Sequence, residues 1–296
     1  MKRFIALLFV LIVPCFCLAD MVGYSGDTRR YVTEAEKKQF PYNTVVRFMA
    51  GNGGTGTFIS KSIILTCRHV VNDVGMEKQI DYLMADGQRR SAEVQPYIDD
   101  EEEKHDFGWV MDEGAFTGRV LDLAPFVPTN ANNLMVIGYD SLKVLSKDEL
   151  KIVKEVYKYW INKYGKLNRK NANEITSLVD ATLLEHYACK TGKQKNCVKC
   201  GQRRNQNDWP CIFNDGDNMK VRSGCKITNI GDRIETNCPG SPGTSGAAFI
   251  DVDRKQIIGI FCQGVEQIGQ EKDASSAGTR TEQYYKYFKP WVDVTK

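Results

Sequence analysis

A serine in a glycine-rich turn is the first residue of this sequence that could do chemistry. Ser245 follows Gly243 and Thr244, precedes Gly246, and leads into the apolar run 247–250. Because Gly243 can adopt backbone angles that a side chain forbids, this turn can direct two backbone N–H groups at a point beside the serine hydroxyl. Acyl transfer needs such an attacking oxygen, together with donors for the oxyanion that it creates. The alternative is an ordinary turn between strands, where glycine, serine and proline are common.

Three histidines limit the search for a general base. His69 follows the apolar run 63–67, so we expect it at the end of a strand, where its side chain can face a cleft. Asp106 opens a second apolar run and is the candidate partner acid. Of the other two histidines, His105 is expected to be an ordinary loop residue next to Asp106, and His186 a surface or packing residue. The order histidine, aspartate, serine along a β-rich chain favours a catalytic set over three unrelated residues.

Runs of β-branched and apolar residues, separated by turn signals, recur along the chain outside its middle. Strands are expected at 44–49, 55–59, 62–66, 80–84, 90–94, 107–110, 134–139 and 257–261. Short strands, frequent turns and no helical period predict an all-β fold built from a closed barrel. The tail, 281–294, is expected to form a short C-terminal helix broken or kinked at Pro290.

The pattern changes at Ser146, which stands three residues before Glu149 as in a capping box. Apolar residues at helical spacing follow as far as Tyr164, and a second helix is expected at 172–187. We interpret 141–210 as a helical, cysteine-rich insertion in a β protein.

The first 19 residues have the form of a secretory signal peptide. Lys2 and Arg3 precede the apolar run 4–13, and the cleavage positions 17–19 carry small residues. This run is too short and wrongly flanked for a stable membrane span, and no later segment is apolar enough for one. Its removal lowers the formal net charge of +3 by two. A nearly neutral chain gives no electrostatic argument for binding nucleic acid or a membrane.

Ten cysteines are present, and the eight outside the signal peptide are an even number in a chain expected to be exported, to the periplasm or the extracellular space. Disulfides are therefore their expected state. A hairpin with arms at 220–227 and 233–238 would bring Cys225 near Cys238, which predicts one bridge. Two further disulfides are favoured over a zinc site among Cys189, Cys197, Cys200 and Cys211. The acidic run 99–103 is favoured as a solvated loop over a cation site.

These motifs resemble the trypsin-like (chymotrypsin-fold) serine proteases and are most similar to the bacterial V8-like, or glutamyl-endopeptidase, branch. The resemblance covers most of the chain after the signal peptide, apart from about 141–210. The histidine motif corresponds to 56–59 followed by 65–71, and the aspartate motif to 106–108. The opening of the second barrel corresponds to 136–139, the serine motif to 241–246, and the strand that pairs with the substrate backbone to 259–264. Segments 27–29 and 41–43 also resemble the N-terminal arm of that branch.

The resemblance implies two six-stranded antiparallel β-barrels of the chymotrypsin type. The signal peptide, 1–19, is then followed by an N-terminal arm or pro-segment, 20–42. The first barrel covers 43–125, and the second covers 126–296 and carries the insertion 141–210.

The resemblance also implies a mechanism for a serine endopeptidase. Ser245 attacks a peptide carbonyl, His69 takes and returns the proton, and Asp106 holds the imidazole in the correct tautomer. The backbone N–H groups of Gly243 and Ser245 bind the oxyanion, and the substrate is a peptide or protein. No metal or organic cofactor is required. The residues of the substrate-binding strand are Phe261, Cys262, Gln263 and Gly264.

Four positions depart from the family pattern around the pocket. Thr244 stands where many activated relatives have an aspartate that pairs with a new N-terminus, which argues against activation by that route. Phe261 stands where glutamate-specific relatives have a histidine. Pro239 and Gly240 occupy the pocket base, where trypsin-like Lys/Arg preference needs an aspartate. We therefore expect the primary pocket to accept a small or apolar side chain of the substrate.

Cys262 departs from the pattern beside the catalytic pair. It replaces a serine whose hydroxyl normally donates to the aspartate, and a thiol is a poorer donor. A disulfide between Cys67 and Cys262 is the alternative, because both would flank the active site.

Two other functions remain open at this point. One is a quality-control protease of the HtrA type that lacks PDZ modules, and the other is a catalytically inactive protease fold used for binding. The insertion 141–210 has no counterpart in the family and is a candidate lid, exosite or partner-docking segment.

Overall fold

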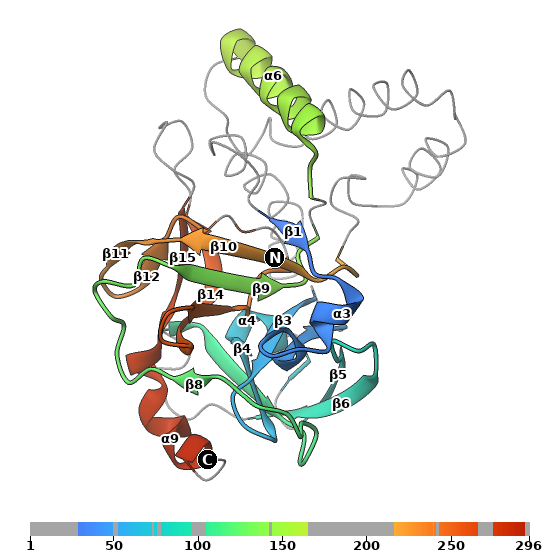
Figure 1. Cartoon of the computed structure of the whole chain (residues 1–296), viewed down its shortest axis with the longest axis vertical. Helices are drawn as coiled ribbons and strands as arrows, with labels where there is room; N and C mark the ends of the chain where they lie inside the picture. Colours follow the sequence, from blue (N-terminus) through green and yellow to red (C-terminus); the bar gives the residue numbers. More distant parts are fainter. Residues whose placement is uncertain are drawn as a thin grey trace, which may run out of the picture. The chain divides into compact units, whose positions relative to one another are not determined.

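The structure is a computed structural model of the chain (Figure 1). It describes residues 29–49, 53–72, 74–75, 78–95, 105–141, 144–164, 216–238, 240, 243–265 and 275–293. Thr28–Asp140, Asp217–Val265 and Ser275–Lys296 form one compact unit, and Ser141–Gly216 belongs to a second, so each is described by itself. The expected signal peptide, 1–19, lies outside the described residues. Within those residues, no helix combines the length and the apolar character that crossing a membrane requires.

Six antiparallel strands close into a barrel in the order β2-β3-β4-β7-β6-β5. Their bounds are β2 (Val45–Phe48), β3 (Gly54–Phe58), β4 (Ile63–Cys67), β5 (Gln79–Leu83), β6 (Arg89–Val94) and β7 (Phe107–Met111). Each expected strand of this region is present, because β-branched and aromatic side chains pack well on a pleated, half-buried surface. The predicted closed barrel is confirmed.

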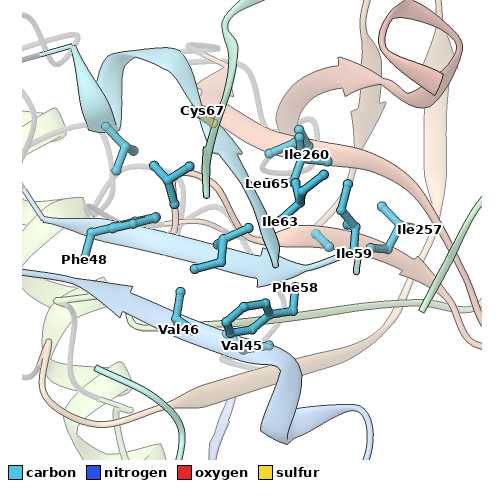
Figure 2. Close-up of a cluster of buried hydrophobic side chains, with 14 of the residues drawn as sticks. Val45, Val46, Phe48, Phe58, Ile59, Ile63, Leu65, Cys67, Ile257 and Ile260 are labelled. Atoms are coloured by element: carbon cyan, nitrogen blue, oxygen red, sulfur yellow. The ribbon is translucent and has the colours of Figure 1, made fainter. Parts of the chain in front are cut away.

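The inward side chains of this barrel form a core that continues into the second half of the fold (Figure 2). Phe48 and Phe58 are fully buried inside the barrel. Ile257 and Ile260, from the other half, belong to the same buried cluster. Burying one such side chain contributes about 1.5–3 kcal/mol, so the shared core stabilises the two halves together.

A nine-stranded sheet forms the second half. Eight strands follow the order β1-β10-β9-β13-β14-β15-β12-β11, and β8 pairs with β14. Their bounds are β1 (Arg30–Tyr31), β8 (Asp122–Leu123), β9 (Leu134–Gly138), β10 (Lys220–Cys225), β11 (Ile227–Ile230), β12 (Ile234–Thr236), β13 (Ala248–Asp251), β14 (Gln256–Val265) and β15 (Ser275–Arg280). The predicted chymotrypsin-like two-barrel fold is confirmed, with the second barrel present as a curled half-barrel that the additional strands β1 and β8 extend.

The predicted hairpin between 220 and 238 is shorter than expected. β10 pairs with β9 and β1, so the arms of the hairpin are β11 and β12. Cys225 precedes β11 and Cys238 follows β12, so the hairpin still brings them together. The predicted disulfide between them is confirmed, with the two Cα atoms 5.2 Å apart.

Short helices complete this unit. They are α3 (Glu34–Lys37), η1 (Tyr42–Thr44), α4 (Arg68–Val71), η3 (Thr281–Gln283) and α9 (Tyr285–Asp293). The expected C-terminal helix is present, and of the two expected effects of Pro290, a break or a kink, the break does not occur, because α9 continues through this residue. Tyr284 and Phe288 hold this end of the chain on the closed barrel, because their rings lie 5.4 Å from Phe107 and 5.5 Å from Trp109, measured between centroids.

The inserted segment contributes one described helix, α6 (Lys147–Tyr164). Its start carries the predicted capping box: the N–H of Glu149 donates to Ser146 Oγ at 3.2 Å, and the N–H of Ser146 donates to Glu149 Oε2 at 2.6 Å. The expected second helix, 172–187, lies outside the described residues. So do His186, the acidic run 99–103, and the cysteines at 189, 197, 200 and 211.

A carboxylate cluster ties β5 and β6 to the end of β7. Asp112 accepts hydrogen bonds from Tyr82 Oη at 2.8 Å and from Arg90 Nε and Nη2 at 2.8 and 3.1 Å. Burial alone would raise the pKa of Asp112, but the bonds from Arg90 and Tyr82 outweigh it and hold the pKa below its ordinary value. A carboxylate with a lowered pKa in the folded state stabilises the fold above its unfolded pKa, and this contribution is lost as the pH falls through the folded pKa.

We predict that Asp112→Asn lowers the free energy of unfolding by about 1–2 kcal/mol at pH 7, because charge-assisted hydrogen bonds are lost. The difference from the wild type should begin to shrink below about pH 4, where the carboxylate of the unfolded wild type takes up a proton, and it should shrink further as the pH falls through the lowered pKa of the folded state. Urea unfolding across a pH series measures it. Glu113→Gln, at the exposed neighbouring position, is the control and should change stability little. A deficit that stays constant down to pH 2 would contradict the prediction.

Candidate active site

Two neighbouring strands of the closed barrel place His69 and Asp106 side by side. β4 and β7 are antiparallel, and Cys67 pairs with Phe107 where β4 ends and β7 begins. His69 follows β4 in the helical turn α4, and Asp106 immediately precedes β7. The N–H of Arg68 donates to the carbonyl oxygen of Asp106 at 3.1 Å, which joins the two connecting segments.

The carboxylate of Asp106 contacts His69 at two points. Oδ2 lies 2.8 Å from Nδ1 of the ring, and Oδ1 accepts from the backbone N–H of His69 at 3.0 Å. A neutral ring that donates its Nδ1–H to a carboxylate leaves Nε2 as an acceptor, which is the state that a general base needs. The histidine side chain is 44% exposed, so its ring is accessible from solvent.

Asp106 has a left-handed backbone conformation, with φ of 55°. Aspartate is one of the few residues other than glycine that adopt this region readily. The Sγ atom of Cys262 lies 3.2 Å from the carbonyl oxygen of Asp106, and Thr279 Oγ1 donates to the carbonyl oxygen of the preceding His105. Contacts from β14 and β15 therefore support the turn that carries the acid.

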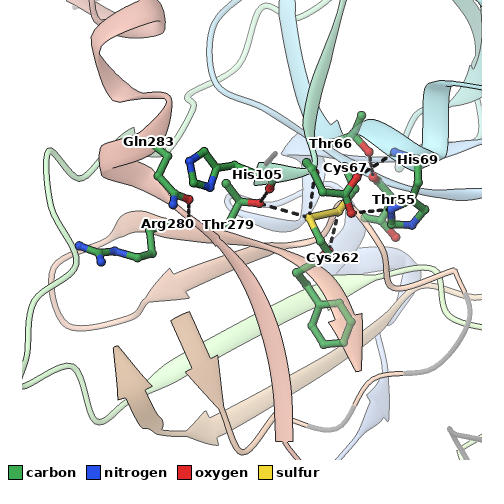
Figure 3. Close-up of a disulfide and its surroundings, with 11 residues drawn as sticks. Thr55, Thr66, Cys67, His69, His105, Cys262, Thr279, Arg280 and Gln283 are labelled. Atoms are coloured by element: carbon green, nitrogen blue, oxygen red, sulfur yellow. Dashed lines mark hydrogen bonds and ion pairs between the residues drawn. A yellow bond between two sulfur atoms is a disulfide. The ribbon is translucent and has the colours of Figure 1, made fainter. Parts of the chain in front are cut away.

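A disulfide between Cys67 and Cys262 joins β4 to β14 beside this pair (Figure 3). The two Cα atoms are 5.7 Å apart, and both residues are buried. The alternative pairing considered from the sequence is therefore the observed one. A disulfide sulfur carries no proton, so Cys262 cannot replace the serine hydroxyl as a donor to the aspartate. A covalent link between the two halves of the fold stands in its place.

Ser245 lies in the turn that precedes β13, and two contacts bring this turn to the same corner of the barrel. Its carbonyl oxygen accepts from the N–H of Thr55 on β3 at 2.8 Å. A Cβ built on the adjacent Gly54 would lie 3.3 Å from that oxygen and 2.6 Å from a methyl group of Val70. Val70 follows His69 in the chain, so the serine turn lies close to the helical turn that carries the histidine.

Two N–H groups of the turn have no backbone acceptor within the described part of the chain. Gly243 has φ of 92°, and a Cβ there would overlap the carbonyl oxygen of Tyr139, so only glycine suits the position. Thr55 braces the turn, because its Oγ1 donates to Gly243 O at 2.7 Å and accepts from the N–H of Tyr139 at 3.0 Å. Among the described residues, the N–H groups of Gly243 and Ser245 donate to no other backbone oxygen.

The expected substrate-binding strand is the end of β14. Its pairing with β13 stops at Ile260, whereas its pairing with β15 continues to Val265. The ring of Phe261 is buried, with its centroid 5.7 Å from that of Phe249. Cys262 is held in the disulfide. Gln263 and Gly264 continue the strand, and the side chain of Gln263 lies outside the described part of the structure.

Several residues that shape the serine turn were not singled out from the sequence. Thr55 is one, and a buried ion cluster of Arg29, Asp140, Lys220 and Arg222 is another. A signal for the cluster exists, because Lys220 and Arg222 alternate along a strand with the apolar Val221 between them. Two cations on one face of a strand indicate either that this face is exposed to solvent or that a buried acidic residue pairs with them.

A sequence profile of the trypsin-like peptidase domain matches residues 54–260, which is more than half of the chain. The chain belongs to the trypsin-like peptidase family. It is therefore a serine endopeptidase by family, with a peptide or protein as its substrate. No curated protein matches the sequence.

Solved structures are similar to this trypsin-like peptidase in fold. A glutamyl endopeptidase is 16% identical, with a TM-score of 0.53, and the match covers 91% of this chain and 98% of that one. A serine endoprotease from Yersinia pestis is 14% identical, with a TM-score of 0.49, over 88% of this chain and 67% of that one. Neuropsin, a serine protease of mouse brain, is 11% identical, with a TM-score of 0.49, and the match covers 88% of this chain and 97% of that one. At these identities the first similarity shows the fold alone, and the other two carry no argument.

Two double variants separate the covalent and the hydrogen-bonded ways of holding Asp106. Cys67→Ala with Cys262→Ser removes the bridge and supplies a hydroxyl, whereas Cys67→Ala with Cys262→Ala removes both. Each should lose about 3–5 kcal/mol of stability, since the bridge closes a long loop with a sequence separation of 195.

We predict that kcat for peptide hydrolysis is about tenfold higher in the serine variant than in the alanine variant, because the hydroxyl can donate to the carboxylate. Thermal unfolding fixes a temperature at which both are folded, and kcat is compared there. Equal kcat values in the two variants would show that Asp106 needs no donor at this position.

Proposed function

We propose that this trypsin-like peptidase hydrolyses peptide bonds through a triad of Ser245, His69 and Asp106. The observation that carries the proposal is the 2.8 Å contact between His69 Nδ1 and Asp106 Oδ2, at the corner of the barrel that the serine turn also approaches. Among the described residues, the N–H groups of Gly243 and Ser245 donate to no backbone oxygen, which supports their role as oxyanion donors.

The first half of the reaction forms an acyl-enzyme. Ser245 Oγ attacks the carbonyl carbon of the scissile peptide while His69 Nε2 takes the hydroxyl proton. The carbonyl oxygen becomes an oxyanion and accepts from the N–H groups of Gly243 and Ser245. The C–N bond then breaks, the imidazolium gives its proton to the leaving amine, and an ester remains on the serine.

The second half hydrolyses that ester. His69 Nε2 takes a proton from a water molecule, and the water oxygen attacks the ester carbonyl. A second oxyanion forms at the same two donors and collapses, the proton returns to Ser245 Oγ, and the new carboxylate leaves. Asp106 accepts from Nδ1–H throughout, so it holds the ring orientation and stabilises the imidazolium formed in each half.

Ser245→Ala tests this assignment. We predict that it lowers kcat/KM for peptide hydrolysis by at least about 10⁴-fold without changing the circular dichroism spectrum. Ser223→Ala, at an exposed position of β10, is the matched control and should retain wild-type turnover.

Labelling with a fluorophosphonate probe gives the second readout of the same experiment. The wild type should be labelled and Ser245→Ala should not. Unchanged turnover in Ser245→Ala would refute the triad. A folded wild type that neither labels nor hydrolyses peptides would favour the inactive, peptide-binding alternative.

We also propose that the primary pocket takes a small or apolar side chain. The ring of Phe261 is buried and lies so close to Gly240 that a Cβ there would overlap it. An aromatic ring donates no hydrogen bond to a carboxylate, so the glutamate preference of the glutamyl-endopeptidase branch is not expected here. Because the Phe261 ring lies so close to Gly240, we expect the primary pocket between them to be shallow.

Profiling cleavage of a peptide library tests the pocket. We predict that the wild type cleaves after small or apolar residues, and that Phe261→Val moves the preference towards larger apolar residues by about tenfold in relative kcat/KM. Phe58→Val makes the same change in the core of the other barrel and should leave the preference unchanged. An identical profile in Phe261→Val would contradict the proposed role of this ring.

We further propose that the chain is exported to the periplasm or the extracellular space after removal of 1–19. Two disulfides among the described cysteines support this, because such bonds persist in oxidising compartments. The proposed division remains an arm at 20–42, a first barrel at 43–125 and a second at 126–296.

The insertion 141–210 is proposed as a contact site for a partner or a substrate. Its helix α6 supports this with an exposed Tyr159 ring, above which the ammonium group of Lys163 lies 5.5 Å from the centroid.

A further inference from the structure

A buried ion cluster lies behind the serine turn. Asp140, which follows β9, is its only described acid, and Arg29, Lys220 and Arg222 are its cations. The side chains of Asp140, Lys220 and Arg222 are fully buried, and that of Arg29 is 1% exposed. Charges are so costly to bury that they are retained inside a protein only with close partners.

Each of the three oxygen atoms of Asp140, two in the carboxylate and one in the backbone carbonyl, accepts a hydrogen bond from a different cation. Arg29 Nη1 donates to Oδ1 at 2.6 Å, and Arg222 Nη2 donates to Oδ2 at 2.7 Å. Lys220 Nζ donates to the backbone carbonyl oxygen at 2.7 Å. The side chain and the backbone of this aspartate are therefore both fixed by buried cations.

The N-terminal arm supplies one of these cations. Lys220 and Arg222 are alternate residues of β10 and face the same side of the sheet. Arg29 directly precedes β1, whose Arg30 pairs with Val221 of β10. The two-residue strand thus holds the arm on the edge of β10, where Arg29 reaches the buried aspartate while Arg30 stays exposed.

Asp140 in turn contacts the serine turn in two ways. A Cβ built on Gly243 would lie 3.3 Å from the Cα atom of Asp140, so the two backbones are in close contact. Arg222 Nη2, which binds Asp140, also lies 3.5 Å from Oγ1 of Thr244. Displacement of the aspartate would therefore move the two residues that precede Ser245.

We propose that Arg29 is a positioning residue of the serine turn. Its guanidinium group holds Asp140, and Asp140 holds Gly243 and Thr244 so that the N–H groups of the turn are directed at the substrate oxyanion. The inference rests on the function proposed above and adds a residue that touches neither the substrate nor the reacting atoms. Arg29 lies within the chain, and its side chain is always charged. Its ion pair with Asp140 therefore forms without a newly cut N-terminus, which in many activated relatives pairs with an aspartate at the position of Thr244.

Arg29→Ala and its neighbour Arg30→Ala form the test pair. Arg30 is exposed and pairs with Glu36 at the surface, so its replacement controls for loss of a cation from the same arm. We expect Arg29→Ala to lower kcat for peptide hydrolysis about 100-fold, as misplaced catalytic groups do, with KM little changed. Arg29→Lys should recover most of kcat, because it returns a cation to the cluster. Arg30→Ala should match the wild type in both parameters.

The outcomes separate the two proposals. Wild-type kcat in folded Arg29→Ala, or an equal loss in Arg30→Ala, overturns the positioning role and leaves the triad intact. A folded wild type that neither hydrolyses peptides nor labels at Ser245 overturns the proposed function itself.

Asp140→Asn decides the question if Arg29→Ala does not fold. The change keeps the size of the side chain and its backbone contacts but removes the charge that Arg29 binds. A low kcat with a native near-ultraviolet circular dichroism spectrum supports the proposal. A lower unfolding temperature with wild-type kcat shows a purely structural role and overturns it.

Discussion

The pairing of β4 with β7 sets the position of the His–Asp pair. Because Cys67 lies opposite Phe107, the residues that follow one strand and precede the other meet at the same end of the barrel. Side chains alternate along a strand, so a slip of one residue would move His69 away from Asp106 and turn core residues towards solvent. The disulfide from Cys67 to Cys262 and the hydrogen bond from Thr55 to Ser245 then attach the second half of the fold to that register.

The supports of the site differ in kind from those that the family pattern predicts. A covalent sulfur bridge stands where the family pattern has a serine hydroxyl. A buried side-chain cation lies behind the serine turn, whereas many activated relatives pair a new N-terminal amine with an aspartate before the serine. Both supports are rigid, because a disulfide constrains two strands directly and a buried ion cluster tolerates little displacement of its members. The same chemistry can therefore rest on different scaffolding interactions within one fold.

Local features of the sequence were sufficient for many of the elements. The strands of the closed barrel follow from β-branched runs, α6 follows from its capping box at Ser146, and the bridge between Cys225 and Cys238 follows from a hairpin. β15 was not predicted, because its residues, Ser275–Arg280, are mostly small and form a strand by pairing with β14. The contact between Arg29 and Asp140 joins positions 111 residues apart, and no local pattern encodes such a distance.

In the candidate site, too, some features follow from local sequence and others depend on contacts between distant positions. The order of His69, Asp106 and Ser245 and the motifs around them indicated the chemistry, because residue types and neighbours are local information. The sequence left Cys262 as either a thiol or half of a disulfide, since the choice depends on whether β4 and β14 bring two cysteines together. The burial of Phe261 against Gly240 depends likewise on how β14 packs on a segment some twenty residues earlier in the chain.

The left-handed backbone of Asp106 has a consequence for how this position can vary during evolution. Most side chains are strained in that region, whereas aspartate and asparagine tolerate it. Asparagine would keep the turn but lose the negative charge beside the imidazole, and glutamate would keep the charge but strain the backbone. Under the proposed mechanism, position 106 is therefore restricted twice, once by its backbone conformation and once by the negative charge that the imidazole needs. Aspartate satisfies both restrictions, so neutral drift has almost no route through this residue.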